Sequence, residues 1–94
     1  MKIAWSGPAK RDLDTILLHI AADNPEAALA VCDRIEEAVR SLLMHPRLGR
    51  PGRIDGTREL IVTGTPYVVP YRIRAATVEV LAIFHGARKW PIEL

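Results

Sequence analysis

The stretch LLHIAADNPEAALAV (residues 17–31) decides the fold, because one helix ends and another begins within it. Asn24 is a favourable N-cap, Pro25 suits the first helical position, and Glu26 places a negative charge in the first turn. So short a link between two helices predicts an antiparallel helical hairpin.

Apolar residues recur at helical spacing on both sides of this link. Before it, Ser6 can cap a helix over residues 7–22, whose apolar stripe is Ala9, Leu13, Ile16, Leu17 and Ile20. After it, a second helix is expected to end near Met44 or His45, because Pro46 disfavours helical backbone at the residue before it. Its apolar stripe is Ala28, Val31, Ile35, Ala38, Val39 and Leu42.

The rest of the chain has the pattern of strands. A short opening strand is predicted over residues 2–5, and an irregular loop rich in glycine, proline and arginine over residues 46–56. Three strands are then predicted over residues 58–63, 67–73 and 78–84, the last almost wholly apolar, as a central strand would be. The turns between them are short, which predicts an antiparallel meander.

Two features of the strand over residues 67–73 constrain its place. Pro70 cannot donate to a neighbouring strand, so we expect it at an edge position or at a bulge. Tyr67 and Tyr71 share the face opposite Arg72, and we expect both tyrosines to pack against the helices. The sequence therefore predicts one α+β domain over residues 1–94 with the order βααβββ. In it, a helical hairpin packs on one face of a small, mainly antiparallel four-stranded sheet, and the other face is partly open.

Composition excludes several classes of protein. Hydrophobic residues make up 49% of the 94 residues, too many for a disordered chain. The single cysteine, Cys32, excludes an internal disulfide and a multi-cysteine zinc site, and His19 and His45 match no metal motif. No apolar run is long enough for a bilayer or a signal peptide. We therefore expect a cytoplasmic protein without a cofactor, a metal or a membrane partner.

Charge is distributed unevenly along the chain. Residues 1–46 carry five Lys/Arg against seven acids, whereas residues 47–94 carry eight against four, and seven of those eight are arginines. The planar arginine side chain suits phosphate and carboxylate recognition. A basic face that meets nucleic acid or an acidic protein is one interpretation, and a set of solvated arginines is the other.

Several short motifs, in this order and spacing, resemble the RelE/ParE toxin superfamily over essentially the whole chain. They are Trp5-Ser6, Asp12-Leu13, Asn24-Pro25, PRLGRP (46–51), GTREL (56–60), PYVV (66–69), Tyr71-Arg72-Ile73 and VLAIFHGAR (80–88). The resemblance implies a growth-inhibiting toxin of a bacterial type II toxin–antitoxin system, co-produced with a labile antitoxin that neutralises it.

The superfamily divides by target, and the resemblance leaves two alternatives. ParE-like members inhibit DNA gyrase by binding, whereas RelE-like members are ribosome-dependent endoribonucleases that cut mRNA without a metal. The GTREL motif and the short ending after Arg88 favour the ParE side. In either case the resemblance implies an antitoxin bound in 1:1 toxin–antitoxin units within a larger assembly, with DNA contacted only indirectly, through the antitoxin.

The RelE-like alternative would need a catalytic cluster on the sheet. The candidates are Arg58, Arg72, His85 and Arg88, where an antiparallel pairing could bring Arg58 near Arg72. The alternative roles are ion pairs of the two arginines with Glu59 or Glu79 and a strand-ending hydrogen bond from His85 to the backbone. Arginine stays protonated and is a poor general base, which weighs against catalysis.

A wider set of residues could bind the antitoxin or the target. These are Arg47, Arg50, Arg53, Arg58, Arg72, Arg88 and Trp90. For the arginines of the loop, plain exposure to solvent is the alternative. Trp90 either anchors a partner or folds back on the core, and folding back is the favoured interpretation.

Overall fold

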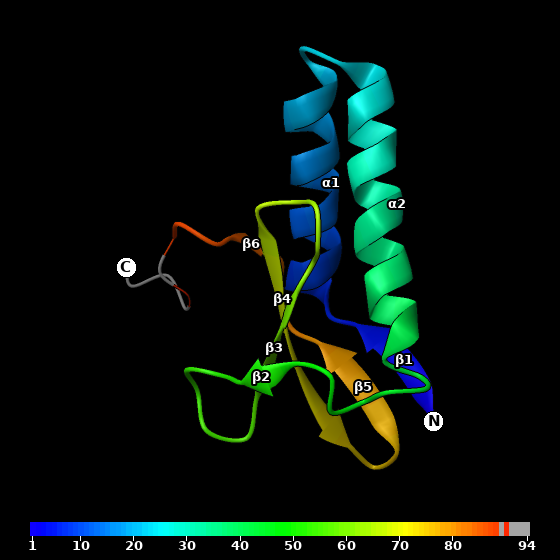
Figure 1. Cartoon of the computed structure of the whole chain (residues 1–94), viewed down its shortest axis with the longest axis vertical. Helices are drawn as coiled ribbons and strands as arrows, with labels where there is room; N and C mark the ends of the chain where they lie inside the picture. The colour runs from blue at the N-terminus through cyan, green and yellow to red at the C-terminus, as the bar shows by residue number, and fades with distance from the viewer. Residues whose placement is uncertain (89, 91–94) are drawn as a thin grey trace.

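The computed structural model describes residues 1–88 and Trp90. Strand β1 (Lys2–Trp5) leads into the hairpin of α1 (Gly7–Ala21) and α2 (Pro25–Ser41). Five strands follow, namely β2 (Arg50–Pro51), β3 (Arg58–Ile61), β4 (Tyr67–Arg74), β5 (Thr77–Val80) and β6 (Phe84–His85). Figure 1 shows the two helices side by side, with the sheet extending beyond their lower ends.

Both helices begin at the residues that the sequence predicts. The Ser6 hydroxyl accepts the Ala9 N–H at 3.1 Å, and the Asn24 side chain accepts the Ala27 N–H at 3.1 Å. The second helix ends at Ser41, earlier than predicted. The next residues, up to Met44, continue in a tighter turn whose N–H groups bond three residues back, which shortens the helix before Pro46 is reached.

The sheet is mixed and has more strands than the four predicted. Its order is β1-β5-β4-β3-β2, with β6 also pairing with β4, and β1 runs parallel to β5. The antiparallel meander of β3, β4 and β5 is confirmed. The loop predicted over residues 46–56 contains the two-residue strand β2, which pairs with the start of β3.

The predicted strand over residues 78–84 is broken, and the break explains Pro70. Tyr71 pairs with Val80, but Val68 pairs with Phe84, so two residues of β4 face three residues between β5 and β6. This is a bulge of one extra residue, and it lies beside Pro70, whose carbonyl accepts the Leu81 N–H at 2.9 Å. Of the two expected positions for Pro70, the bulge is correct and the edge is wrong, because β4 is central.

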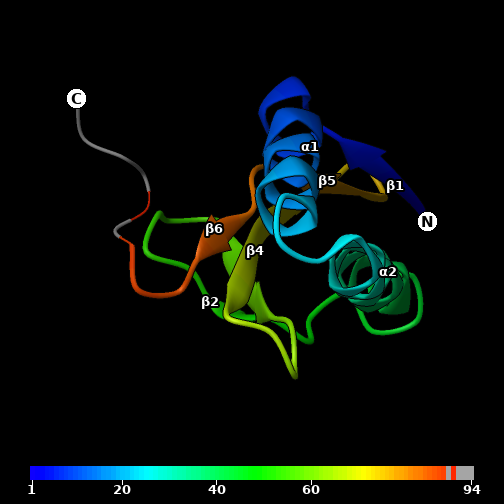
Figure 2. The ribbon, with the colours of Figure 1, turned by 90° about the horizontal axis from the view of Figure 1, so that it is seen from above.

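The hydrophobic core lies between the helices and one face of the sheet. Ile16, Ile35 and Val39 of the helices pack there against Leu60 and Val80, among others. Seen from above, both helices lie together, while the loop around β2 and the turn that follows β6 lie away from them (Figure 2). None of the helices described is long and apolar enough to cross a membrane.

The two tyrosines of β4 pack as the alternation predicts. Tyr71 is fully buried in the core, and Tyr67 is partly buried against it. Residues that alternate with them therefore point to the side of the sheet away from the helices, which we term the second face. The second face is not bare, because Glu59, Val68, Pro70 and Phe84 on it are buried.

Candidate functional site

The buried carboxylate of Glu59 lies on the part of the second face that β2 and β3 form. Glu59 of β3 is directly opposite Arg50 of β2, and its carboxylate contacts the Arg50 guanidinium at 3.2 Å. The same carboxylate accepts the backbone N–H of Arg53 at 3.1 Å and lies 3.5 Å from the Arg53 side chain. Glu59 thus connects Arg50 and Arg53 of the loop to the sheet, and we term these three residues the buried-acid cluster.

Aromatic rings extend the buried-acid cluster toward the C-terminus. The Arg53 guanidinium lies over the ring of Phe84, 5.1 Å from its centroid. Trp90 stacks on Phe84 with ring centroids 6.0 Å apart and nearly parallel planes. Cation–π and stacking contacts hold these groups in a fixed arrangement. The prediction that Trp90 folds back on the protein is therefore confirmed.

The part of the second face that β4 and β5 form carries a similar set of charges. Arg72 of β4 is directly opposite Glu79 of β5, and their side chains meet at 2.6 Å. Arg74 approaches the same carboxylate at 3.5 Å. The hydrogen bond from Arg72, together with the charges of both arginines, holds the pKa of Glu79 below its ordinary value. We term this the exposed-acid cluster.

Arg58 belongs to the helix side of the sheet instead. It pairs with Tyr71, and its guanidinium donates to the carbonyl of Gly49 at 2.8 Å and to that of Arg47 at 3.3 Å. The Tyr71 hydroxyl accepts the Gly49 N–H at 2.9 Å and donates to Pro46 at 2.7 Å. Burial raises the pKa of this hydroxyl. These bonds fix the loop between α2 and β2 against the sheet.

The four predicted catalytic residues are not brought into one cluster. The antiparallel pairing does place Arg58 opposite Tyr71, next to Arg72, but the two arginine side chains point to opposite faces of the sheet and form no common cluster. The expected ion pair of Arg72 with Glu79 is present. Glu59, the other expected acid, pairs with Arg50 and Arg53 instead of Arg58.

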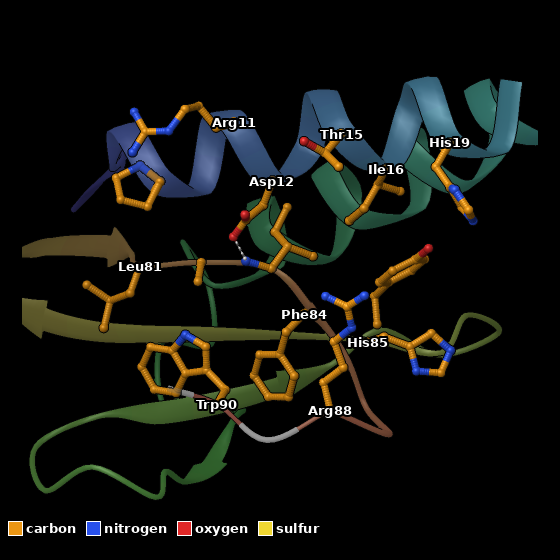
Figure 3. A pocket seen from close by; sticks show the side chains of 14 residues that line it. Arg11, Asp12, Thr15, Ile16, His19, Leu81, Phe84, His85, Arg88 and Trp90 are labelled. Carbon is orange, nitrogen blue, oxygen red and sulfur yellow. Dashed lines mark hydrogen bonds between the residues drawn. The ribbon is translucent and has the colours of Figure 1, made fainter. Parts of the chain in front are cut away.

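His85 and Arg88 lie in a separate place, a groove between α1 and the chain that follows β5 (Figure 3). The His85 ring accepts the Ala87 N–H at 3.1 Å and meets Tyr67 edge to face at 5.9 Å. This local bond to the backbone matches the structural role considered for His85. Arg88 is exposed and lines the same groove as Phe84 and His85 (Figure 3).

The groove itself was not predicted. Its apolar lining includes Ile16, Ile83 and Phe84, and its wall along α1 includes Arg11 and His19. The Asp12 carboxylate accepts the Ile83 N–H at 2.9 Å, which fixes the position of the bulge against α1 (Figure 3). A sequence signal existed, since Asp12 lies off the apolar stripe of its helix, but its partner is 71 residues away along the chain.

The described residues offer little for metal or thiol chemistry. No group of three or more His, Cys, Asp or Glu residues is placed to hold a metal ion within residues 1–88. Cys32 is buried, and burial together with nearby acids raises the pKa of its thiol. A protonated, buried thiol is a poor nucleophile.

The fold agrees with comparisons to known proteins. A family model, the ParE toxin of the type II toxin–antitoxin system parDE, matches residues 3–90. A candidate toxin of Sinorhizobium fredii, Y4kP, is 46% identical over 90 residues, which cover 96% of this chain and 93% of that protein. Toxin RelE1 of Caulobacter vibrioides is 32% identical over 80 residues, which cover 83% and 85% respectively.

Solved structures give the same result. A chromosomal ParDE toxin–antitoxin system from P. aeruginosa has a chain with a TM-score of 0.82 and 31% identity, covering 90% of this chain and 95% of that one. The RelBE2 complex from Mycobacterium tuberculosis gives a TM-score of 0.62 and 30% identity, covering 89% and 95%. Fold and sequence together define a toxin of the RelE/ParE superfamily. The chain belongs to the ParE toxin family of type II toxin–antitoxin systems.

Proposed function

We propose that this toxin acts as ParE-like toxins do, by binding DNA gyrase in the cytoplasm and blocking it without making or breaking covalent bonds. The observation that carries the proposal is the dispersal of the four candidate catalytic residues. Arg58 is on the helix side, Arg72 is paired with Glu79 on the second face, and His85 and Arg88 lie in the groove. Metal-free RNA cleavage needs a base, an acid and phosphate-binding cations around one phosphate.

The test is a supercoiling assay with purified gyrase and purified toxin. We expect inhibition that increases with toxin concentration, and induction in cells should give filamentation and a DNA-damage response. Mapping of RNA 5′ ends after induction separates the alternative. Cleavage at mRNA codons that His85→Ala or Arg72→Ala abolishes without unfolding the protein would contradict gyrase binding and support a nuclease.

A second part of the proposal is an antitoxin that covers the groove beside α1. Apolar side chains of an antitoxin segment would contact Leu81 and Trp90, which are partly exposed in the groove, and its acidic side chains would contact Arg11 and Arg88 at the rim. This complementarity follows from the groove, which combines an apolar lining with two arginines.

Co-purification with the product of the neighbouring gene tests the antitoxin proposal. We expect one complex on size exclusion, and we expect Arg88→Glu to weaken it more than Arg40→Glu, an equal change of charge on the exposed side of α2. Failure of the two proteins to co-elute, or equal weakening by both variants, would contradict the proposed location.

A further inference from the structure

Four arginines on the second face form two clusters around one acid each, Arg50 and Arg53 around Glu59 and Arg72 and Arg74 around Glu79. We propose that this face binds the phosphate backbone of duplex DNA through these four arginines. The sequence-based expectation was that DNA is contacted only through the antitoxin. With such direct contact, a gyrase inhibitor would bind the nucleic acid as well as the enzyme.

The acids lie beneath the arginines. The side chain of Glu59 is 1% exposed, whereas those of Arg50 and Arg53 are 52% and 41% exposed. In the other cluster Glu79 is 28% exposed, against 41% for Arg72 and 64% for Arg74. The loop adds one exposed acid, Asp55. A polyanion that approaches this face therefore meets more positive than negative charge, although each acid neutralises part of the charge of its two arginines.

Each acid also holds its arginines in position. Because Arg72 is bound through Nε and Arg50 through one terminal nitrogen, other N–H groups of both guanidinium ions can still donate. Arginines held in this way lose less side-chain entropy when they bind phosphate. The clusters can therefore bind anions in addition to stabilising the fold.

The spacing of the clusters fits a repeated anion. The register places Glu59 opposite Pro70 and Glu79 opposite Arg72, two residues further along β4 on the same face. Strand spacing and rise put the two acids about 12 Å apart, from Cα to Cα. Two clusters at this separation can contact different phosphates of one backbone, as electrostatic binding of DNA requires.

The burial of Phe84 on this face favours a duplex over a single strand. Single strands bind by stacking bases on aromatic side chains that are free to receive them. Here Phe84 is only 6% exposed and has Arg53 and Trp90 on its ring, so Phe84 offers no free platform. The choice of DNA over duplex RNA rests on the proposed function, since gyrase acts on DNA.

Fluorescence anisotropy of a labelled DNA duplex, titrated with purified toxin over a range of salt concentrations, tests the inference. Four phosphate contacts predict a slope of about −3.6 for log K against log[salt]. Removal of two contacts in Arg72→Gln/Arg74→Gln should bring the slope to about −1.8. Glu79→Gln should tighten binding, because it removes a negative charge beside both arginines.

The matched control is Lys10→Gln/Arg40→Gln, which removes the same charge from exposed positions on the two helices. We expect its slope to equal that of the unmodified toxin. No binding of the duplex at low salt, an equal loss in the control, or tighter binding of a single-stranded RNA would overturn the inference. Inhibition of gyrase by a toxin that fails to bind the duplex would leave the proposed function intact and remove only this inference.

Discussion

The buried-acid and exposed-acid clusters have the same composition, two arginines and one glutamate, yet they differ in what surrounds the acid. Glu59 is 1% exposed, accepts a backbone N–H as well as side-chain contacts, and connects a loop to the sheet. Glu79 is 28% exposed and links only neighbouring strands, through side chains. The first cluster therefore stabilises the arrangement of the chain, whereas the second mainly sets the positions of two cations.

Burial decides how much each acid contributes to stability. A buried carboxylate has lost its hydration, so its hydrogen bonds and ion pairs must compensate, and removal of the charge breaks all of them together. A partly exposed carboxylate exchanges its partners for water at little cost. The two glutamates thus allow the same substitution to be compared in one protein.

The largest effect is expected for Glu59→Gln. The substitution retains an acceptor for the Arg53 N–H but leaves two guanidinium groups facing a buried neutral amide. We expect the free energy of unfolding to fall by about 2 to 3 kcal/mol. Urea denaturation with a far-UV signal measures the change, and a loss equal to that of Glu79→Gln would show that the two clusters do not differ.

The next largest effect is expected for Tyr71→Phe. The loop of the buried-acid cluster is also fixed on the helix side of the sheet, by the hydroxyl of this tyrosine. The variant loses both hydrogen bonds of the hydroxyl and leaves the buried N–H of Gly49 without its partner. We expect a loss of about 1 to 3 kcal/mol in the free energy of unfolding. Tyr67→Phe is the control, because Tyr67 is only partly buried. Equal losses in both variants would argue against the fixed loop.

The exposed-acid cluster lies on a hairpin whose turn carries strain. Ala75 and Ala76 have φ values of 51° and 57°, a left-handed conformation that costs an alanine energy and that Asn-Gly adopts readily. Replacing the pair, Ala75→Asn/Ala76→Gly, should stabilise the protein by about 1 kcal/mol. A rise in the urea midpoint with an unchanged slope is expected. A fall would mean that the alanines make contacts which outweigh the strain.

Much of the fold could be predicted because its signals are local. The caps at Ser6 and Asn24 and the apolar periodicity locate both helices, and alternation assigns Tyr71 to the core. The strand β2 was missed because its two residues have no periodicity, and the break before β6 because an apolar run does not show a bulge. Arg58 and Arg72 are adjacent in the strand register but point to opposite faces, because side chains alternate along each strand. The expectation that the two arginines lie near each other did not take this alternation into account.

The site was harder to predict than the fold, because its contacts join residues that are distant along the chain. Glu59 with Arg53, and Asp12 with the Ile83 N–H, meet only once the loop and the bulge are in place. Trp90 was correctly expected to fold back, because an exposed indole is unfavourable, but nothing in the sequence indicates that Phe84 would receive it. Side chains that cover a sheet face from a loop or a tail have no periodic signal.

The smallest effect is expected from Glu79, and it should appear as a dependence on pH. The hydrogen bond from Arg72 lowers the pKa of the folded carboxyl below its ordinary value of 4.5. Its contribution to stability is therefore complete above the ordinary pKa and is lost as the pH falls through the lower folded value. The stability advantage of the unmodified toxin over Glu79→Gln, measured by urea denaturation, should be small at neutral pH and should vanish in acid. An advantage that persists at a pH where the carboxyl is protonated would show that the glutamate acts through packing and not through its charge.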